Sequence, residues 1–351
     1  MAWTPPSLAD LLDHGFDTVI DVRSPAEFAE DHVPGAINLP VLDNEERARV
    51  GTLYAQVSPF DARKLGAALV FRNAAAHIEG ALSHHEGGWQ PLVYCWRGGQ
   101  RSGAFAWMLR EIGWRAELIA GGYKTYRRLV VDMLQRKPLA HRIVQLGGYT
   151  GTAKTDLLPL LEARGVQVVD LEGLANHRGS LLGAMGGQPS QKAFESALAV
   201  RLCGMDPARP VLVEAESSKI GGLLIPPSLW AAMKRAPWIE VSAPMKARAE
   251  YLVRAYEDIL ADADGLQRKL APLKAHRGEA LLAHWAALGA AGDRHALVRS
   301  LMEDHYDPAY AKSMKATAPK VLARVEAAGL APAQLERVAD GVAAALQSAV
   351  I

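Results

Sequence analysis

The stretch VYCWRGGQRSG, residues 93–103, decides the fold of the first part of this chain. It runs from an apolar segment into a glycine pair and then into residues 102–114, where apolar side chains recur at helical spacing. Apolar, β-branched runs typical of strands cover residues 17–24, 91–95 and 116–122. Strands that alternate with helices predict a parallel α/β sheet covered by helices.

Cys95 opens this loop and is one of two cysteines, which are too few for a disulfide framework or a thiolate metal cage. A thiolate is favoured by nearby cations and by the N–H groups at a helix N-terminus, and glycines let the backbone curl around the sulfur. We therefore predict that Cys95 is the catalytic residue and that the loop around it forms an anion-binding cradle. A buried strand-end cysteine beside a surface turn is the alternative. The other predicted members of the cradle are Arg97, Gly98, Gly99, Gln100, Arg101 and Ser102. Ser102 is also expected to cap the following helix.

A second series of strands and helices begins after the polar segment 136–142, which contains Pro138. Its strand-like runs are residues 143–148, 165–173, 210–217 and 238–243, and from Pro244 onward the pattern is helical with no further strand. The expected architecture is an N-terminal parallel α/β domain at 1–137, a second α/β domain at 138–243, and a helical C-terminal region at 244–351 that continues the second domain.

The segment GYTGTAKT, residues 148–155, resembles the phosphate loop G-x-x-x-x-G-K-[ST] after an apolar strand. Ala153 stands where the motif has its second glycine, so we expect either a negative φ there or a slightly remodelled loop. A glycine-rich turn without a ligand is the alternative. The residues predicted to bind a diphosphate, with the Thr155 hydroxyl also able to hold Mg²⁺, are Gly148, Gly151, Thr152, Lys154 and Thr155.

Acidic and polar side chains follow the next two strands, at the sheet edge where α/β proteins bind ligands. They could contact substrate or hold Mg²⁺ through water, or they could simply be solvated, which is the preferred interpretation for Glu172 and Glu216. The candidates are Asp170, Glu172, His177, Arg178 and Glu214. No residue set is predicted to bind a metal ion permanently.

The formal net charge of +1 means that an anionic partner must be bound by a local patch. Residues 124–142 hold six basic residues against one acidic residue. We expect these to contact nucleic-acid phosphates, and the alternative is a solvated helix face. The six are Lys124, Arg127, Arg128, Arg136, Lys137 and Arg142. A second basic set, which includes Arg248, lies in the C-terminal region. Trp96 could stack on an RNA base or pack against the protein.

The first domain resembles the rhodanese family. The segment VIDVRSPAEFAEDHVPGAINLP, residues 19–40, matches that family's early motif, and Cys95 matches its sulfur-carrying cysteine. The resemblance implies that Cys95 carries a chalcogen as a persulfide or perselenide. Many rhodaneses place an arginine five residues after the cysteine, whereas Arg101 follows by six. The longer loop indicates room for a group larger than sulfur.

A rhodanese domain followed by a phosphate-loop domain, with CWRGGQRS, VVDLEGLANHRGS, VLVEAESSKIG and IPPSLW, resembles the family of bacterial tRNA 2-selenouridine synthases. Membership implies a transferase that replaces the sulfur of wobble 2-thiouridine by selenium from selenophosphate, through S-geranyl-2-thiouridine made from geranyl diphosphate. Cys95 would be the selenation residue and the phosphate loop would hold the diphosphate. The partners would be the tRNA anticodon stem-loop and an enzyme that supplies selenophosphate, with no tightly bound cofactor.

Two other functions fit parts of the pattern. One is a P-loop kinase or NTPase that carries a sulfur-relay rhodanese domain. The other is a non-catalytic module that senses or relays sulfur. The N-terminus shows no secretory signal and no run of about twenty apolar residues occurs, so we expect a cytoplasmic location without membrane contact.

Overall fold

The structure is a computed structural model that describes residues 2–180 and 182–348. The chain divides into two compact units. The first unit contains the residues up to Arg136 together with Pro189–Gly204, and the second contains Lys137–Gln188 and the residues from Met205 onward. None of the helices within the described ranges is long and apolar enough to cross a bilayer.

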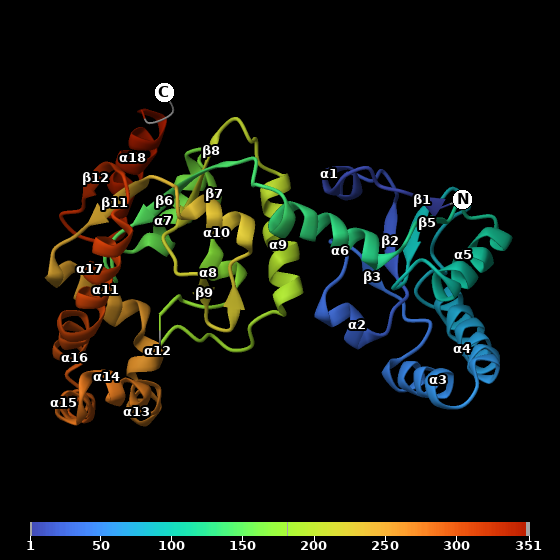
Figure 1. Cartoon of the computed structure of the whole chain (residues 1–351), viewed down its shortest axis with the longest axis horizontal. Helices are drawn as coiled ribbons and strands as arrows, with labels where there is room; N and C mark the ends of the chain where they lie inside the picture. Colours follow the sequence, from blue (N-terminus) through green and yellow to red (C-terminus); the bar gives the residue numbers. More distant parts are fainter. Residues whose placement is uncertain (1, 181, 349–351) are drawn as a thin grey trace. The chain divides into compact units, whose positions relative to one another are not determined.

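The first unit is built on a five-stranded sheet in which every neighbouring pair is parallel (Figure 1). All four residues of its central strand are buried, as expected for a parallel sheet covered on both faces. The strands predicted from the sequence are confirmed here. The sheet order is β1 (Ala2–Trp3), β5 (Glu117–Ile119), β4 (Pro91–Tyr94), β2 (Thr18–Asp21) and β3 (Ile37–Asn38).

Helices surround this sheet, and their apolar faces supply its core. Helix α5 buries Phe105, Ala106 and Leu109 against it and ends at Gly113, whose left-handed backbone terminates the helix. The helices of this unit are α1 (Leu8–Leu12), α2 (Pro25–Glu30), α3 (Asn44–Gln56), α4 (Pro59–Glu79), α5 (Gln100–Ile112), α6 (Tyr123–Val131), the π-helix η1 (Asp132–Arg136) and α9 (Gln191–Cys203).

Helix α9 lies beyond the second unit's first strands in sequence, yet it packs against α1, α6 and η1 of the first unit. Its polar contacts fix it there. Ser196 Oγ donates to the buried Asp31 carboxylate at 3.0 Å, and Arg127 forms an ion pair with Glu195. The segment Pro189–Gly204 is therefore part of the first unit's packing.

The second unit contains another five-stranded parallel sheet and a short antiparallel pair. The expectation of helices alone after Pro244 is wrong at one element, because β12 pairs with β11 at the sheet edge. Its last four residues, 323–326, alternate apolar and charged, which suits a half-exposed edge strand. The order is β12 (Val321–Glu326), β11 (Trp238–Ser242), β6 (Arg142–Gly147), β8 (Pro210–Glu214) and β7 (Gln167–Val169); the pair is β9 (Lys219–Ile220) and β10 (Leu223–Leu224).

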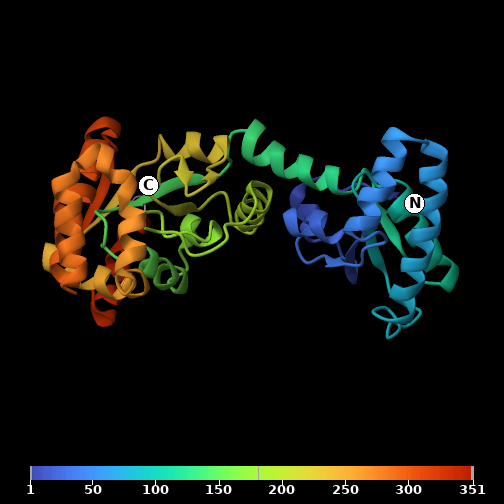
Figure 2. The ribbon, with the colours of Figure 1, turned by 90° about the horizontal axis from the view of Figure 1, so that it is seen from below.

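Helices α7 (Lys154–Ala163) and α18 (Pro332–Ser348) pack together over this sheet and share its core. The helices that follow β11 gather at one end of the unit, where Figure 2 shows them in orange. The remaining helices are α8 (Leu171–Leu174), α10 (Pro227–Met233), α11 (Met245–Ala255), α12 (Glu257–Leu260), α13 (Ala263–Leu270), η2 (Ala271–Leu273), α14 (Lys274–Arg277), α15 (Glu279–Ala290), α16 (Arg294–Leu301), η3 (Met302–Tyr306) and α17 (Asp307–Thr317).

Candidate active site

Cys95 lies directly after β4, and the loop that follows leads into the first turn of α5. Its side chain is almost fully buried, at 3% exposure. Ser102 Oγ donates a hydrogen bond to Cys95 Sγ at 3.1 Å. The expectation that Ser102 caps α5 is therefore wrong. Gly99 is the N-cap residue, and the Ser102 hydroxyl lies near the sulfur instead.

A second glycine pair, at the start of α6, supports the cysteine loop. Gly98 has a φ of +64°, and Gly122 has a φ of +61°. A Cβ on Gly122 would lie 2.2 Å from the Cys95 carbonyl oxygen, so only glycine allows this approach. The Tyr123 N–H then donates to that oxygen at 2.8 Å. The sequence analysis missed Gly122, because it lies 27 residues from Cys95 and no local pattern links the two.

The two predicted cradle arginines have different surroundings. Arg97 is exposed. Arg101 forms an ion pair with Glu27 of α2 at 2.8 Å. Burial of Glu27 acts to raise the pKa of this carboxyl, but the hydrogen bond and charge of Arg101 outweigh it and lower that pKa. Glu27 also accepts from the Ser24 N–H, so it fixes the start of α2 beside the cradle.

A buried ion pair lies beneath the loop. Arg23 donates to the Asp21 carboxylate at 2.6 Å, and both side chains are at most 1% exposed. The Arg23 guanidinium stacks on the Tyr123 ring, and Tyr123 in turn stacks on Trp96 at 5.2 Å between ring centroids. Trp96 therefore packs against the protein, which was one of its two expected roles.

The predicted phosphate loop runs from the end of β6 to the N-terminus of α7 and lines an open pocket of about 880 Å³ in the second unit. Ala153 keeps the left-handed conformation, with a φ of 57°. The expected negative φ is therefore wrong, and the helix begins at Lys154. All five predicted diphosphate-binding residues line the pocket: Gly148, Gly151, Thr152, Lys154 and Thr155.

Carboxylates gather beside Thr155. Its hydroxyl lies 3.2 Å from a Glu172 oxygen and 3.3 Å from a Glu214 oxygen. Burial, and then repulsion from Glu216, raise the pKa of Glu172 to about 8. Burial and the Glu172 charge likewise raise the pKa of Glu214. Glu216 lines the pocket with Glu172, so its solvated interpretation is not supported.

The other predicted contacts divide into two groups. Arg178 lines the pocket, where it forms an ion pair with Asp258 at 3.0 Å. Asp170 instead accepts from the Gly173 N–H at 2.7 Å and caps α8. His177 is 8% exposed and does not line the pocket. Burial lowers the pKa of the His177 imidazole.

Two of the C-terminal helices, α11 and α17, contact and support the phosphate loop. Arg248 of α11 is 5% exposed, donates to the Thr150 carbonyl at 2.9 Å and pairs with Asp307 of α17 at 2.6 Å. The Gly148 N–H donates to the Tyr310 hydroxyl at 2.8 Å. Arg248 is thus a buried support of the loop and not an exposed RNA contact. The sequence analysis missed both Tyr310 and the supporting role of Arg248.

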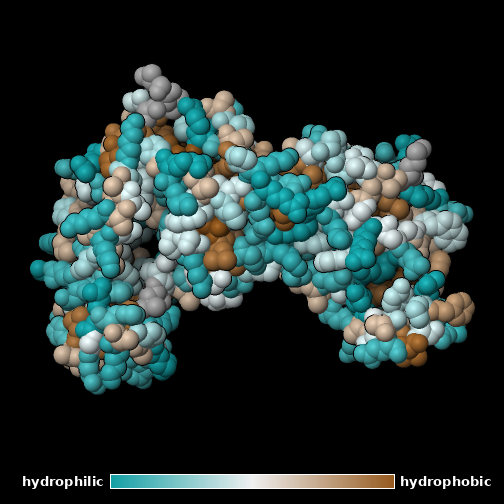
Figure 3. All heavy atoms as spheres, in the orientation of Figure 1, coloured by the Kyte–Doolittle hydropathy of each residue, from teal (hydrophilic) through white to brown (hydrophobic). Residues whose placement is uncertain are grey.

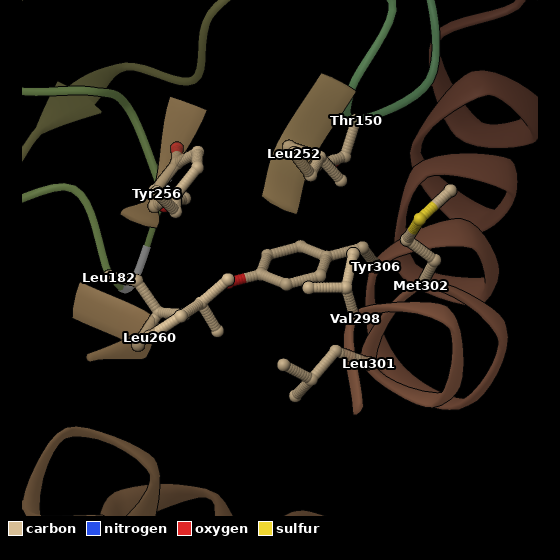
Figure 4. A pocket seen from close by; sticks show the side chains of 10 residues that line it. Thr150, Leu182, Leu252, Tyr256, Leu260, Val298, Leu301, Met302 and Tyr306 are labelled. Carbon is tan, nitrogen blue, oxygen red and sulfur yellow. Dashed lines mark hydrogen bonds between the residues drawn. The ribbon is translucent and has the colours of Figure 1, made fainter. Parts of the chain in front are cut away.

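An apolar recess adjoins the phosphate loop (Figure 4). Five residues line both this recess and the larger pocket: Thr150, Ser180, Leu252, Tyr256 and Tyr306. The recess itself is narrow, with a volume of about 30 Å³. Its other lining residues are Leu182, Leu260, Val298, Leu301 and Met302. The phosphate loop therefore borders an apolar wall that local sequence patterns did not indicate.

The six predicted tRNA contacts also divide. Arg127 forms an ion pair with Glu195 inside the first unit, and Arg142 donates to the Ala208 carbonyl at 2.7 Å while remaining exposed. The others are exposed on α6, η1 and the start of the second unit: Lys124, Arg128, Arg136 and Lys137. Among the described residues, no group of three or more His, Cys, Asp or Glu side chains is arranged to hold a metal ion.

Comparisons with known proteins match both units. A rhodanese-like domain matches residues 4–129, and the AAA domain of tRNA 2-selenouridine synthase matches residues 141–270. The tRNA 2-selenouridine synthase of Hahella chejuensis is 35% identical, over 89% of each chain. That of Cupriavidus pinatubonensis is 33% identical, over 89% of this chain and 93% of the relative. The chain belongs to the tRNA 2-selenouridine synthase family.

Proposed function

We propose that this protein exchanges the sulfur of a wobble 2-thiouridine in tRNA for selenium by two reactions, geranylation in the phosphate-loop pocket and selenation at Cys95. Family membership gives the overall reaction, a transferase that makes 2-selenouridine with selenophosphate as the donor. The geranyl intermediate and the residue assignments are the proposed part. One observation carries them: the phosphate loop opens onto an apolar wall.

A diphosphate leaving group needs positive charge and N–H donors as its bond to carbon breaks. Between Gly148 and Ala153 the loop offers the backbone N–H groups that are not already donated to Tyr310 or Tyr149, and Lys154 lies at its end. Lys154 Nζ now donates to the Gly148 carbonyl at 3.0 Å, so it is held within the loop that would enclose the phosphates. These groups would bind geranyl diphosphate and stabilise the released diphosphate.

The apolar wall fits the prenyl chain of this substrate. Leu252, Tyr256 and Tyr306 line the large pocket on the side where the recess begins. The recess is too narrow for ten carbons, so the chain would lie in the large pocket against these side chains. A nucleoside triphosphate has no such apolar tail, and the wall therefore favours a prenyl diphosphate over the kinase or NTPase alternative.

The two reactions balance as follows. The thiouridine sulfur attacks C1 of geranyl diphosphate, the C1–O bond breaks, and the base loses its N3 proton. In the second reaction a selenium nucleophile from selenophosphate, received in the Cys95 loop, attacks C2 of the base. The C2–S bond breaks and its electron pair leaves with geranyl thiolate, which takes a proton. Water then splits the P–Se bond and phosphate is released.

Mg²⁺ fits the chemistry of the loop as a second source of positive charge. The Thr155 hydroxyl and the oxygens of Glu172 and Glu214 are hard ligands of the kind that Mg²⁺ prefers. The exposed basic residues Lys124, Arg128, Arg136, Lys137 and Arg142 would contact tRNA phosphates. We expect the protein to act in the cytoplasm, supplied by an enzyme that makes selenophosphate.

Purified protein, a thiolated anticodon stem-loop RNA and the two donors test this division of labour. With geranyl diphosphate alone, the wild type and Cys95→Ser should form S-geranyl-2-thiouridine, whereas Lys154→Ala should be slowed by about 100-fold. With selenophosphate and geranylated RNA, only Cys95→Ser should fail. Selenouridine formation by Cys95→Ser, or normal geranylation by Lys154→Ala, would contradict the assignment.

A further inference from the structure

The first unit contains a second large cavity, of about 750 Å³, which the proposed function has not used. It lies among α3, α4 and the first turn of α5. Its apolar lining comes mainly from the α3–α4 pair, and its polar lining includes three arginines. The lining includes Arg47, Tyr54, Ala67, Phe71, Gln100 and Arg101.

The apolar side of this groove is unusually open. Helix α3 packs against α4, yet none of its residues is fully buried. Tyr54 is 53% exposed and Phe71 is 41% exposed, and the Phe71 ring contacts the half-exposed Trp107 edge-on. Figure 3 shows hydrophobic surface among the hydrophilic residues over the α3–α4 region. An exposed apolar groove of this kind commonly marks a binding site.

The groove shares two residues with the predicted cysteine cradle. Gln100 and Arg101 belong to both, because they lie on the first turn of α5, whose other side carries Ser102 and its hydrogen bond to Cys95. The arginines gather at this end. Arg101 and Arg47 both approach Glu27, at 2.8 and 3.9 Å. The groove therefore combines an apolar floor with arginines at the end that borders the first turn of α5.

We propose that this groove binds the geranyl group of S-geranyl-2-thiouridine while selenium displaces it. The inference rests on the proposed function. The geranyl chain is joined to C2 of the base through one sulfur atom, so it must lie beside the cradle when C2 is attacked. The apolar floor holds the chain, and the arginines balance the charge of the RNA phosphates. In this step C2–Se forms, C2–S breaks, and geranyl thiolate leaves along the groove and takes a proton from water.

Two neighbouring alanines of α4 give a matched test. Both Ala67 and Ala68 are exposed, but only Ala67 lines the groove. Ala67→Phe should fill the groove, and Ala68→Phe should add the same bulk outside it. Selenation of stem-loop RNA with S-geranyl-2-thiouridine should show a KM raised about tenfold in Ala67→Phe, the equivalent of about 1.4 kcal/mol, and unchanged in Ala68→Phe.

RNA that carries S-methyl-2-thiouridine is the second control. Ala67→Phe should process it as the wild type does, because a methyl group does not reach the groove, and geranylation in the other pocket should also be unaffected. Equal loss on the S-methyl RNA would mean that the groove binds RNA or a protein partner, and it would overturn the proposal. An unchanged KM on the S-geranyl RNA would overturn it as well.

Binding of the S-geranyl-2-thiouridine nucleoside, measured by calorimetry with pyrophosphate saturating the phosphate loop, separates this inference from the proposed function. If the wild type forms no selenouridine from geranylated RNA, the proposed function fails. In that case, the proposal that the groove binds the geranyl group is still supported if the nucleoside binds the wild type and Ala68→Phe about tenfold more tightly than Ala67→Phe. Equal binding to all three proteins would contradict the groove.

Discussion

At the scale of the residue, the cysteine loop depends on glycine where its backbone meets the start of α6. Gly122 combines a positive φ with a Cβ position only 2.2 Å from the Cys95 carbonyl oxygen and 2.5 Å from the Gly98 nitrogen. These atoms belong to the backbone, so they cannot move aside as a flexible side chain would. The position of Cys95 is thus set by a residue that carries no side chain.

Gly122→Ala should abolish selenation and destabilise the protein by roughly 2–5 kcal/mol, from the clash and from the left-handed conformation together. Gly113→Ala is the matched control, because Gly113 also has a positive φ but a Cβ there meets no atom within 4 Å. It should cost about 1 kcal/mol and keep activity. Chemical denaturation and the selenation assay measure both. Similar effects of the two substitutions would mean that the close approach is unimportant.

Glu172 should make stability depend on pH. Burial and then Glu216 raise its pKa to about 8, from 4.5 in an ordinary glutamate. Between these two values the folded protein binds a proton that the unfolded chain lacks, so stability falls as pH rises. The free energy of unfolding of the wild type, relative to Glu172→Gln, should decrease by roughly 1–3 kcal/mol from pH 5 to pH 8.5.

The exposed Glu45 supplies the control for this titration. Urea denaturation of the wild type, Glu172→Gln and Glu45→Gln at several pH values gives the differences directly. Glu45→Gln should follow the wild type at every pH. A constant difference between the wild type and Glu172→Gln would show that Glu172 does not titrate in this range.

At the scale of the element, helices α11 and α17 hold the phosphate loop from outside the sheet. Arg248 joins the Thr150 carbonyl to Asp307, and Tyr310 accepts from the Gly148 N–H. The loop thus gains contacts that a strand and a helix N-terminus alone would not supply. This arrangement explains why a chain with Ala153 in a left-handed conformation can keep its phosphate loop ordered.

Arg248→Ala should leave the Asp307 carboxylate unpaired and destabilise the protein by roughly 2–4 kcal/mol. The KM for geranyl diphosphate should rise at least about tenfold, because the loop carbonyl loses its donor. Arg268→Ala removes an exposed arginine of α13 and should change neither quantity. Geranylation kinetics and chemical denaturation measure these two effects. An unchanged KM in Arg248→Ala would mean that the phosphate loop is ordered without the contacts of Arg248.

Local sequence patterns predicted most strands of both sheets, since each is a short apolar run bounded by polar residues or glycine. They did not predict β12, whose alternating charges suit an edge strand, or the helices α3 and α4, which carry few buried apolar residues. The packing of α9 on the first unit depends on partners far away in sequence, such as Asp31. Long-range contacts of this kind leave no periodic signal.

The candidate site shows the same limit. The loop residues around Cys95 and Lys154 could be predicted because their chemistry lies in consecutive residues. Gly122, Arg248 and Tyr310 reach these loops from distant segments. The apolar wall of the phosphate pocket likewise combines residues of several C-terminal helices. In the sequence, each of these residues resembles an ordinary apolar core residue.

At the scale of the whole molecule, one chain carries two chemically distinct sites in two compact units. The first unit holds a buried cysteine beside an apolar groove, and the second holds a phosphate loop beside an apolar wall. An apolar surface at both sites agrees with the proposed mechanism, in which the same ten-carbon group is attached at one site and removed at the other.

Mass spectrometry of wobble nucleosides from cells that contain only a Cys95→Ser or a Lys154→Ala form of this protein tests that account most directly. We predict that Cys95→Ser accumulates S-geranyl-2-thiouridine and forms no 2-selenouridine. We predict that Lys154→Ala retains 2-thiouridine with little of either product. If 2-selenouridine persists in the Cys95→Ser cells, or if those cells contain no geranylated nucleoside, the two-site mechanism is contradicted.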